Sequence, residues 1–195
     1  MAWKQKEKSR QTKNELMQSA VQVFGRKGFA ASTISEITEN AGYAKGNFYR
    51  YWKSKDDIFL DIMEKRLREY RASRQHGLQS AGSVQEALDV LIDFLESIID
   101  DQNWSKVFLE FTTHAFSRQE LKQKMNNSNY RLSSDLFSEL LTPFTANTQE
   151  CKKLGALVTA LFDGYLIQMA LGTRVLSKQD LRFAIQTLAK ELIYG

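Results

Sequence analysis

The sequence predicts an all-α protein of about nine helices. Apolar residues recur at helical spacings of three, four and seven along most of the 195 residues, and no segment reads as a credible strand. Several of these segments begin with a Ser or Thr that is followed three residues later by an acidic residue, which is the pattern of a helix-capping box. The chain has a single proline, Pro143, so long helices are unobstructed almost everywhere.

The first predicted helix runs from about Gln11 to Lys27. Its apolar residues share one face, and Gly28 follows at the position where a left-handed residue commonly ends a helix. Residues 1–9, before it, are polar and basic, and we expect a flexible arm. Such an arm either lies along DNA or is a disordered tail, and the sequence leaves both interpretations open.

Two short helical patterns around a glycine turn are the central feature of the chain. Thr33 and Glu36 form a capping box for the first pattern, and Gly42 ends it. The second pattern, over residues 45–53, gathers cations and hydrogen-bonding aromatic residues around Phe48. This arrangement is typical of a helix-turn-helix whose second helix enters the major groove of DNA. Together with the helix before it, it predicts a three-helix DNA-binding domain.

A family resemblance is carried by the stretches KGFAASTISEITENAG and GYAKGNFYRYWKSKDDIF. Up to about Lys65 the chain resembles the TetR/AcrR family of bacterial transcriptional regulators, and the remainder resembles it only in length and helical pattern. The resemblance implies a helix-turn-helix DNA-binding domain over residues 1–53 and a helical effector-binding and dimerisation domain over residues 54–195. One position departs from the family: Ala44 stands where a small hydroxyl residue usually caps the recognition helix, a loss of roughly 1 kcal/mol.

The candidate DNA contacts divide into side chains that grip phosphates and side chains that read bases. The first residues of the recognition helix can reach base edges, because Lys and Asn donate to guanine and adenine and a glycine permits close approach. These base-reading candidates are Lys45, Gly46 and Asn47. The resemblance implies phosphate contacts from Thr33, Tyr49, Tyr51, Lys53 and Lys55, and Tyr43 and Arg50 are further candidates.

The charge of the chain is distributed unevenly. Residues 1–53 hold ten Lys or Arg against four Glu, a net charge of +6. The whole chain carries +4, so residues 54–195 together carry −2. A basic first third on a slightly acidic remainder is the electrostatic pattern of a DNA-binding domain joined to a body of another function.

Six further helices are predicted in the body, at about residues 54–74, 84–99, 104–116, 118–141, 150–171 and 178–194. The middle ones are rich in aromatic residues, and in the family this region encloses an effector pocket. Aromatic residues at helical spacing are also the usual content of a plain core, so both interpretations stay open. The pocket candidates are Phe94, Trp104, Phe108, Phe111, His114, Tyr130, Phe137, Phe162, Tyr165 and Met169, and they favour a hydrophobic or aromatic effector.

The last two predicted helices have strong apolar faces. Two antiparallel helices of this kind suit a four-helix interface with a second copy, which the family resemblance also implies and a palindromic operator requires. Part of each face must also contact the chain's own body. The interface candidates are Leu154, Leu157, Leu161, Leu181, Ile185, Leu188 and Leu192.

Other classes of function lack the residues that they need. Two histidines and one cysteine offer no metal cluster or nucleophile triad, and no glycine loop suits a phosphate, so we expect no enzyme and no cofactor. No apolar run reaches the roughly 18 residues of a membrane span, so no membrane partner is expected. The single cysteine, Cys151, fits a reduced cytoplasm.

These observations predict a dimeric, TetR-like transcriptional regulator in the cytoplasm. We expect a repressor that binds a palindromic operator in double-stranded DNA as a homodimer. A small hydrophobic or aromatic effector of unknown identity would release it. The alternative is a DNA-binding regulator without a small-molecule effector that a protein partner controls.

Overall fold

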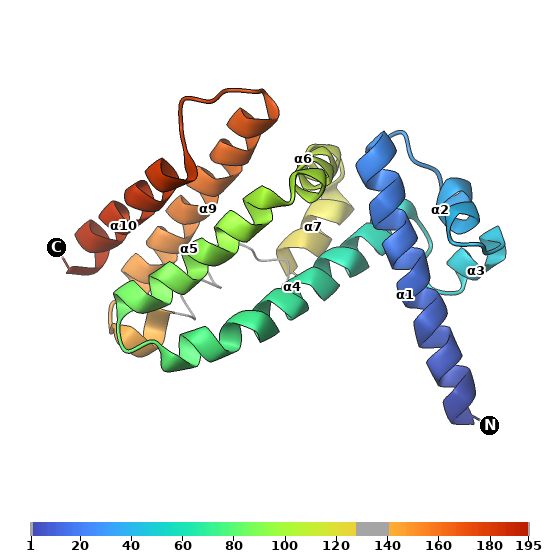
Figure 1. The fold of residues 1–195 in the computed structure, drawn as a ribbon, viewed down its shortest axis with the longest axis horizontal. Helices are drawn as coiled ribbons and strands as arrows, with labels where there is room; N and C mark the ends of the chain where they lie inside the picture. Colours follow the sequence, from blue (N-terminus) through green and yellow to red (C-terminus); the bar gives the residue numbers. More distant parts are fainter. Residues whose placement is uncertain (1, 128–140, 195) are drawn as a thin grey trace. The chain divides into compact units, whose positions relative to one another are not determined.

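The computed structural model describes residues 2–127 and 141–194, and within these ranges every regular element is helical (Figure 1). The prediction of an all-α fold is therefore confirmed. The helices are α1 (Ala2–Lys27), α2 (Ile34–Asn40), α3 (Lys45–Tyr49), α4 (Lys55–Ser80), α5 (Val84–Asp100), α6 (Gln102–Phe116), α7 (Gln119–Asn127), η1 (Thr142–Phe144, a 3₁₀ helix), α9 (Thr148–Ala170) and α10 (Lys178–Tyr194). None of these helices is both long enough and apolar enough to cross a membrane.

The chain forms two compact units. Unit 1 comprises Met1–Arg66 and Lys106–Gln123, and unit 2 comprises Leu67–Ser105 and Lys124–Gly195. Helices α4 and α6 each contribute residues to both units. The helix-turn-helix segment therefore shares its unit with the second half of α6 and the start of α7, which come much later in the sequence.

Helix α1 is longer than the sequence pattern suggests. It begins at Ala2, whereas the apolar periodicity predicts a start near Gln11 and a flexible arm before it. The stretch before Gln11 contains Trp, Lys, Gln, Glu and Arg without Gly or Pro, and most of these are good helix formers. An ion pair between Arg10 and Glu7, three residues apart at 2.7 Å, also supports the helical conformation.

An aromatic core holds unit 1 together. Phe24, Phe29, Phe59 and Phe111 are at most 1% exposed and come from α1, the loop after it, α4 and α6. The rings of Phe59 and Phe111 stack with centroids 3.8 Å apart, and Phe29 meets Phe111 edge to face at 5.1 Å. Burial of this much aromatic surface is worth several kcal/mol per ring, so α6 is part of the support of the helix-turn-helix.

Unit 2 contains α5, α9 and α10, and α10 packs against both α9 and α5 (Figure 1). Their facing stripes include Leu88, Leu91, Val158 and Ile185, each completely buried. On the outer side, the Arg182 guanidinium of α10 pairs with Glu96 at 3.0 Å and with Asp93, so it fixes α10 along α5. The hydrogen bond to Glu96, and after it the one to Asp93, raises the pKa of Arg182 above its ordinary value.

Candidate nucleic-acid interface

The helix-turn-helix is capped as the sequence predicts. The Thr33 hydroxyl accepts the backbone N–H of Glu36 at 3.2 Å, and the Glu36 carboxylate accepts the backbone N–H of Thr33 at 2.9 Å. A hydrogen bond from Lys27 is the largest cause that lowers the pKa of Glu36, to about 2. Gly42 ends α2 with a φ of +74°, a conformation that other residues rarely adopt.

Helix α3 has only five residues, so contacts outside it must hold it in place. Phe48 is completely buried and Trp52 is 5% exposed. The Trp52 indole N–H donates to Asp61 of α4 at 2.9 Å. From α1, the Ser19 hydroxyl donates to the backbone carbonyl of Ile37 in α2 at 2.7 Å. Both short helices are therefore fixed to the longer helices that flank them.

Most of the predicted DNA contacts face solvent. Tyr49 is 53% exposed although it is aromatic, which leaves its hydroxyl available for a ligand. Asn47 is half-buried, and its side-chain amide donates to the backbone carbonyl of Ala44 at 3.3 Å. The exposed members of the predicted set are Thr33, Lys45, Gly46, Tyr49, Arg50 and Lys53.

Two predicted contacts are turned toward α1 instead. The Tyr43 hydroxyl donates to the carboxylate of Glu15, and this hydrogen bond is the largest cause of the lowered pKa of Glu15. The Tyr51 hydroxyl donates to the backbone carbonyl of Ser9 at 3.0 Å. In this structure both hydroxyls tie the helix-turn-helix to α1, and the rings are only half-buried.

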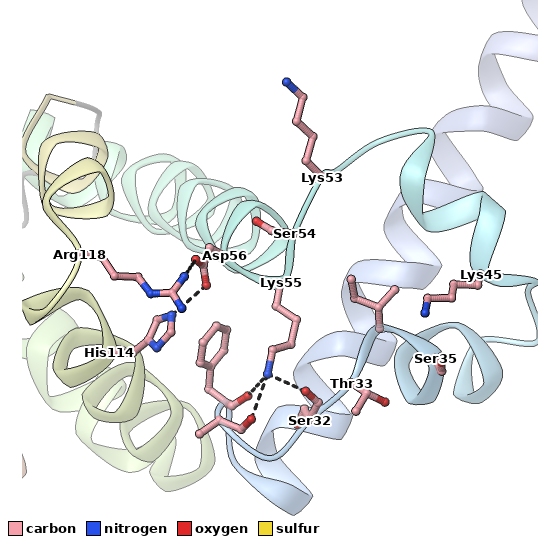
Figure 2. A pocket seen from close by; sticks show the side chains of 13 residues that line it. Ser32, Thr33, Ser35, Lys45, Lys53, Ser54, Lys55, Asp56, His114 and Arg118 are labelled. Carbon is pink, nitrogen blue, oxygen red and sulfur yellow. Dashed lines mark hydrogen bonds and ion pairs between the residues drawn. The ribbon is translucent and has the colours of Figure 1, made fainter.

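Lys55, another predicted phosphate contact, has an internal role in the structure. Its ammonium donates to the backbone carbonyls of Phe29 at 2.7 Å, Ala30 at 3.1 Å and Ser32 at 2.6 Å, as Figure 2 shows. It also lies 4.8 Å from the centre of the Phe29 ring. Burial lowers the pKa of Lys55. The ammonium thus closes the loop between α1 and α2, and it positions Thr33 at the start of α2.

A groove of about 590 Å³ runs beside this loop within unit 1 (Figure 2). Its lining combines hydroxyl and cationic side chains, which are groups that donate hydrogen bonds to phosphate oxygens. The polar and charged side chains in the lining are Ser32, Thr33, Ser35, Lys45, Lys53, Ser54, Lys55, Asp56, His114 and Arg118. A groove of this composition suits one stretch of a sugar-phosphate backbone.

Two of the residues that line the groove come from the distant segment of unit 1. Asp56, in the first turn of α4, pairs with His114 at 3.1 Å and with Arg118 at 3.1 Å (Figure 2). His114 is an effector-pocket candidate from the sequence, whereas Arg118 is not among the candidates. No local signal could have found this cluster, because Asp56 is separated from His114 by 58 positions and from Arg118 by 62.

The structure divides the effector-pocket candidates between the two units. Phe94, Trp104, Phe162 and Tyr165 are buried in unit 2, and Met169, also in unit 2, is 37% exposed. Phe108, Phe111 and His114 belong to unit 1. Tyr130 and Phe137 lie outside the described residues.

Some of the dimer-interface candidates face the core of unit 2, and others are partly or largely exposed to solvent. Leu154, Leu181 and Ile185 are buried at the contact between α9, α10 and the rest of unit 2. Leu161, Leu188 and Leu192 are half-buried, and Leu157 is 41% exposed. Three other apolar residues on the same helices are also exposed: Ile167 at 47%, Met169 at 37% and Phe183 at 72%. The apolar spacing selects the stripe that faces the chain's own core and does not single out Ile167 or Phe183.

Comparison with known proteins assigns the family. The family model of "Bacterial regulatory proteins, tetR family" matches residues 16–62, which span the helix-turn-helix. The uncharacterised HTH-type transcriptional regulator YfiR of Bacillus subtilis is 31% identical over 132 residues, which cover 65% of this chain. The chain spans 62% of that relative's length.

Two solved regulators show the same fold over nearly the whole chain. A transcriptional regulator of Saccharomonospora viridis, solved with choline, has a TM-score of 0.73 at 17% identity and covers 94% of this chain and 98% of its own. The regulator FadR of Bacillus subtilis, solved with stearoyl-CoA, has a TM-score of 0.68 at 20% identity, with 93% and 97% covered. The helix-turn-helix segment therefore belongs to the TetR family of bacterial regulatory proteins, and the described helices of the chain follow the fold of these two regulators.

Proposed function

We propose that the protein is a DNA-binding transcriptional regulator that inserts α3 into the major groove. One observation carries this proposal: the residues on the outer side of α3 are exposed, although the helix is packed against its neighbours. Phe48 is completely buried, and the exposed residues are Lys45, Gly46, Tyr49 and Arg50. Lys45 and Asn47 supply donors for base edges. The groove beside α2 supplies hydroxyl and cationic groups for the adjacent phosphates.

Binding as a homodimer is the second part of the proposal. The outward faces of α9 and α10 carry Leu157, Ile167 and Phe183, and Gly164 lies on α9 with nothing within 4 Å of the position of a Cβ. An exposed glycine inside a helix costs about 1 kcal/mol relative to alanine. It permits close approach of a second helix, so this face fits a second copy of the chain. A dimer presents two recognition helices to a palindromic operator.

Release by a small molecule completes the proposal. Unit 2 contains the buried aromatic residues Phe94, Trp104, Phe162 and Tyr165, whose chemistry suits an apolar or aromatic effector. Two proteins with this fold were solved with stearoyl-CoA and with choline, which supports an effector site in the body of this chain. We propose that an effector favours a state with lower affinity for the operator, so that the protein acts as a repressor.

The DNA proposal is tested by footprinting and fluorescence anisotropy on the DNA that flanks the protein's own gene. We expect a protected palindrome. Asn47→Ala should relax the sequence preference at one position of each half-site by about 1–3 kcal/mol. Lys53→Gln should weaken binding to every duplex about equally and reduce its salt dependence. Absence of any sequence preference in the wild-type protein would contradict the proposal.

The dimer proposal is tested by analytical ultracentrifugation of Phe183→Glu. A charge within the proposed interface should shift the protein from dimer to monomer and reduce operator affinity at least tenfold. Phe116→Glu is a matched control, because Phe116 is an equally large side chain that is 66% exposed on α6. A dimer that survives Phe183→Glu as well as it survives Phe116→Glu would exclude this face.

The effector proposal is tested by thermal shift with acyl-CoA thioesters and with choline as probes. A raised melting temperature together with release from the operator would support a small-molecule effector. Binding by neither probe class nor by a wider set of apolar compounds would favour control by a protein partner.

A further inference from the structure

The first turns of α1 form a cationic helix that no part of the proposed function yet uses. Lys4, Lys6 and Lys8 are exposed, and none of them has an ion-pair partner among residues 2–127 and 141–194. Arg10 differs from them, because it pairs with Glu7. Lys4 and Lys8 lie one turn apart on one face and Lys6 lies on another, so the positive charge surrounds this end of the helix.

This cationic helix is fixed to the recognition helix. The Tyr51 hydroxyl, directly after α3, bonds to the backbone carbonyl of Ser9 at 3.0 Å and lies 3.1 Å from the Ser9 hydroxyl. One turn further along α1, Lys13 pairs with Asp61 at 2.5 Å and lies 5.7 Å from the centre of the Trp52 ring. These contacts hold the end of α3 and the start of α1 together within unit 1.

The geometry sets how far the cationic helix extends. In Figure 1 the N-terminal end of α1 projects beyond α2 and α3. At 1.5 Å per residue, the helix continues roughly 8 Å from Ser9 to Lys4. That length corresponds to two or three base pairs of duplex at 3.4 Å each. A helix keeps its width, so it cannot enter a minor groove as an extended arm does, and its cations are suited to the outer face of the phosphate backbone.

We propose that the first two turns of α1 are a rigid phosphate clamp, in which Lys4, Lys6 and Lys8 contact the backbone of the two or three base pairs that flank each half-site. The clamp rests on the proposed DNA binding and extends it beyond the helix-turn-helix. It contributes affinity without sequence preference, because phosphates carry no base identity.

The test compares two triple variants with equal changes of charge. Lys4→Gln/Lys6→Gln/Lys8→Gln removes the clamp, and Gln retains high helix propensity. Lys106→Gln/Lys152→Gln/Arg174→Gln removes three exposed cations elsewhere. Each protein is titrated by fluorescence anisotropy against two duplexes, one that ends at the palindrome and one with five more base pairs on each side, over a range of salt concentrations.

The clamp predicts a specific pattern. Wild type and the control variant should bind the longer duplex at least fivefold more tightly than the shorter one, whereas the clamp variant should bind the two duplexes equally. The slope of log affinity against log salt should fall by about two to three per subunit only in the clamp variant and only on the longer duplex. Equal slopes and an unchanged length preference in the clamp variant would overturn the clamp and leave the proposed function standing. A wild-type protein without sequence preference would overturn both.

Trp3 gives a second readout that does not depend on affinity. It is 72% exposed, whereas Trp52 and Trp104 are 5% and 6% exposed, so iodide quenching reports mainly on Trp3. We expect the longer duplex to protect Trp3 from iodide and the shorter duplex to protect it less. Equal quenching of Trp3 with and without the longer duplex at saturation would contradict a clamp at this position.

Discussion

The two helices of the helix-turn-helix, α2 and α3, and the last two helices, α9 and α10, are stabilised in different ways. Helices α2 and α3 have seven and five residues, too few to be stable alone, and they depend on contacts from α1, α4 and α6. Helices α9 and α10 have 23 and 17 residues and pack along each other through their own apolar stripes. The short pair exposes polar side chains, and the long pair exposes apolar ones. The difference fits the proposal that the first pair presents hydrogen-bond donors to DNA and that the second pair associates with a second copy of the chain.

The two pairs of helices also differ in where a mutation can act on them. In unit 1, a change far from the recognition helix in sequence can disturb it, because its supports are distant. In unit 2, a change on the outward face leaves the inner packing intact. We therefore expect effects that range from loss of folding at a distant support to a small change at one helix cap.

The largest effect is expected from Phe111→Ala. Phe111 is completely buried against Phe29 and Phe59, so truncation should lower the free energy of unfolding by about 3–5 kcal/mol. Operator binding should be lost at temperatures where the wild type binds. Urea denaturation and anisotropy measure the two effects.

The control for this prediction is Phe116→Ala. Phe116 lies on the same helix but is 66% exposed, so its truncation should change the unfolding free energy by less than about 0.5 kcal/mol. If Phe111→Ala alters only the response to a bound effector and leaves the stability unchanged, then Phe111 lines a pocket, which is the other interpretation that the sequence leaves open.

A smaller effect is expected from Gly28→Ala, about 2–3 kcal/mol. Gly28 has a φ of +83°, and a Cβ there would lie 2.6 Å from the Glu110 carboxylate, which accepts the backbone N–H of Phe29 at 2.6 Å. Gly42 separates the two causes, because it has a φ of +74° with nothing within 4 Å of a Cβ. Gly42→Ala should therefore show only the backbone cost of about 1–2 kcal/mol. Equal losses of thermal stability in both variants would mean that Glu110 moves aside freely.

Asp163 of α9 provides a pH-dependent test in unit 2. Burial raises the pKa of its carboxyl to about 6, so the folded protein holds this proton more tightly than the unfolded chain. Stability should then fall as pH rises from about 4 to 6, and Asp163→Asn should gain roughly 1–2 kcal/mol at pH 7.5 and nothing at pH 3.5.

Asp180 of α10, in the same unit, provides a test in which stability changes with pH in the opposite direction. Its pKa is lowered, first by a hydrogen bond from the Ser177 hydroxyl and then by the Ser177 backbone N–H. Asp180→Asn should therefore reduce stability at pH 7.5, and the loss should be smaller at pH 3. Denaturation curves at both pH values measure the two variants, and a gain from Asp163→Asn that does not depend on pH would contradict the burial argument.

The contrast between local and distant contacts also decides what could be predicted from the sequence. Capping residues act over three positions, so the boxes at Thr33 and Ser177 and the glycine at 42 are predictable from local pattern. The inner stripes of α9 and α10 follow from periodicity. The tether of Tyr51 to Ser9 is not predictable in this way, because it joins residues 42 positions apart. The internal hydrogen bonds of Lys55 are not predictable either, since a lysine beside predicted DNA contacts gives no sign that its ammonium closes an internal loop.

The smallest predicted effect is at the cap of the recognition helix, where the sequence and the structure agree. Ala44 is the N-cap of α3 in an extended conformation, with φ −71° and ψ 149°, and it makes no side-chain hydrogen bond to the helix. Ala44→Ser places a hydroxyl where it can accept the backbone N–H of Gly46 or Asn47, a gain of about 0.5–1 kcal/mol. Helix α3 is short and depends on outside contacts, so the gain should appear as slower hydrogen exchange in residues 45–49 and as two- to fivefold tighter operator binding. Slower exchange without tighter binding would show that the stability of α3 in the free protein does not limit its affinity for the operator.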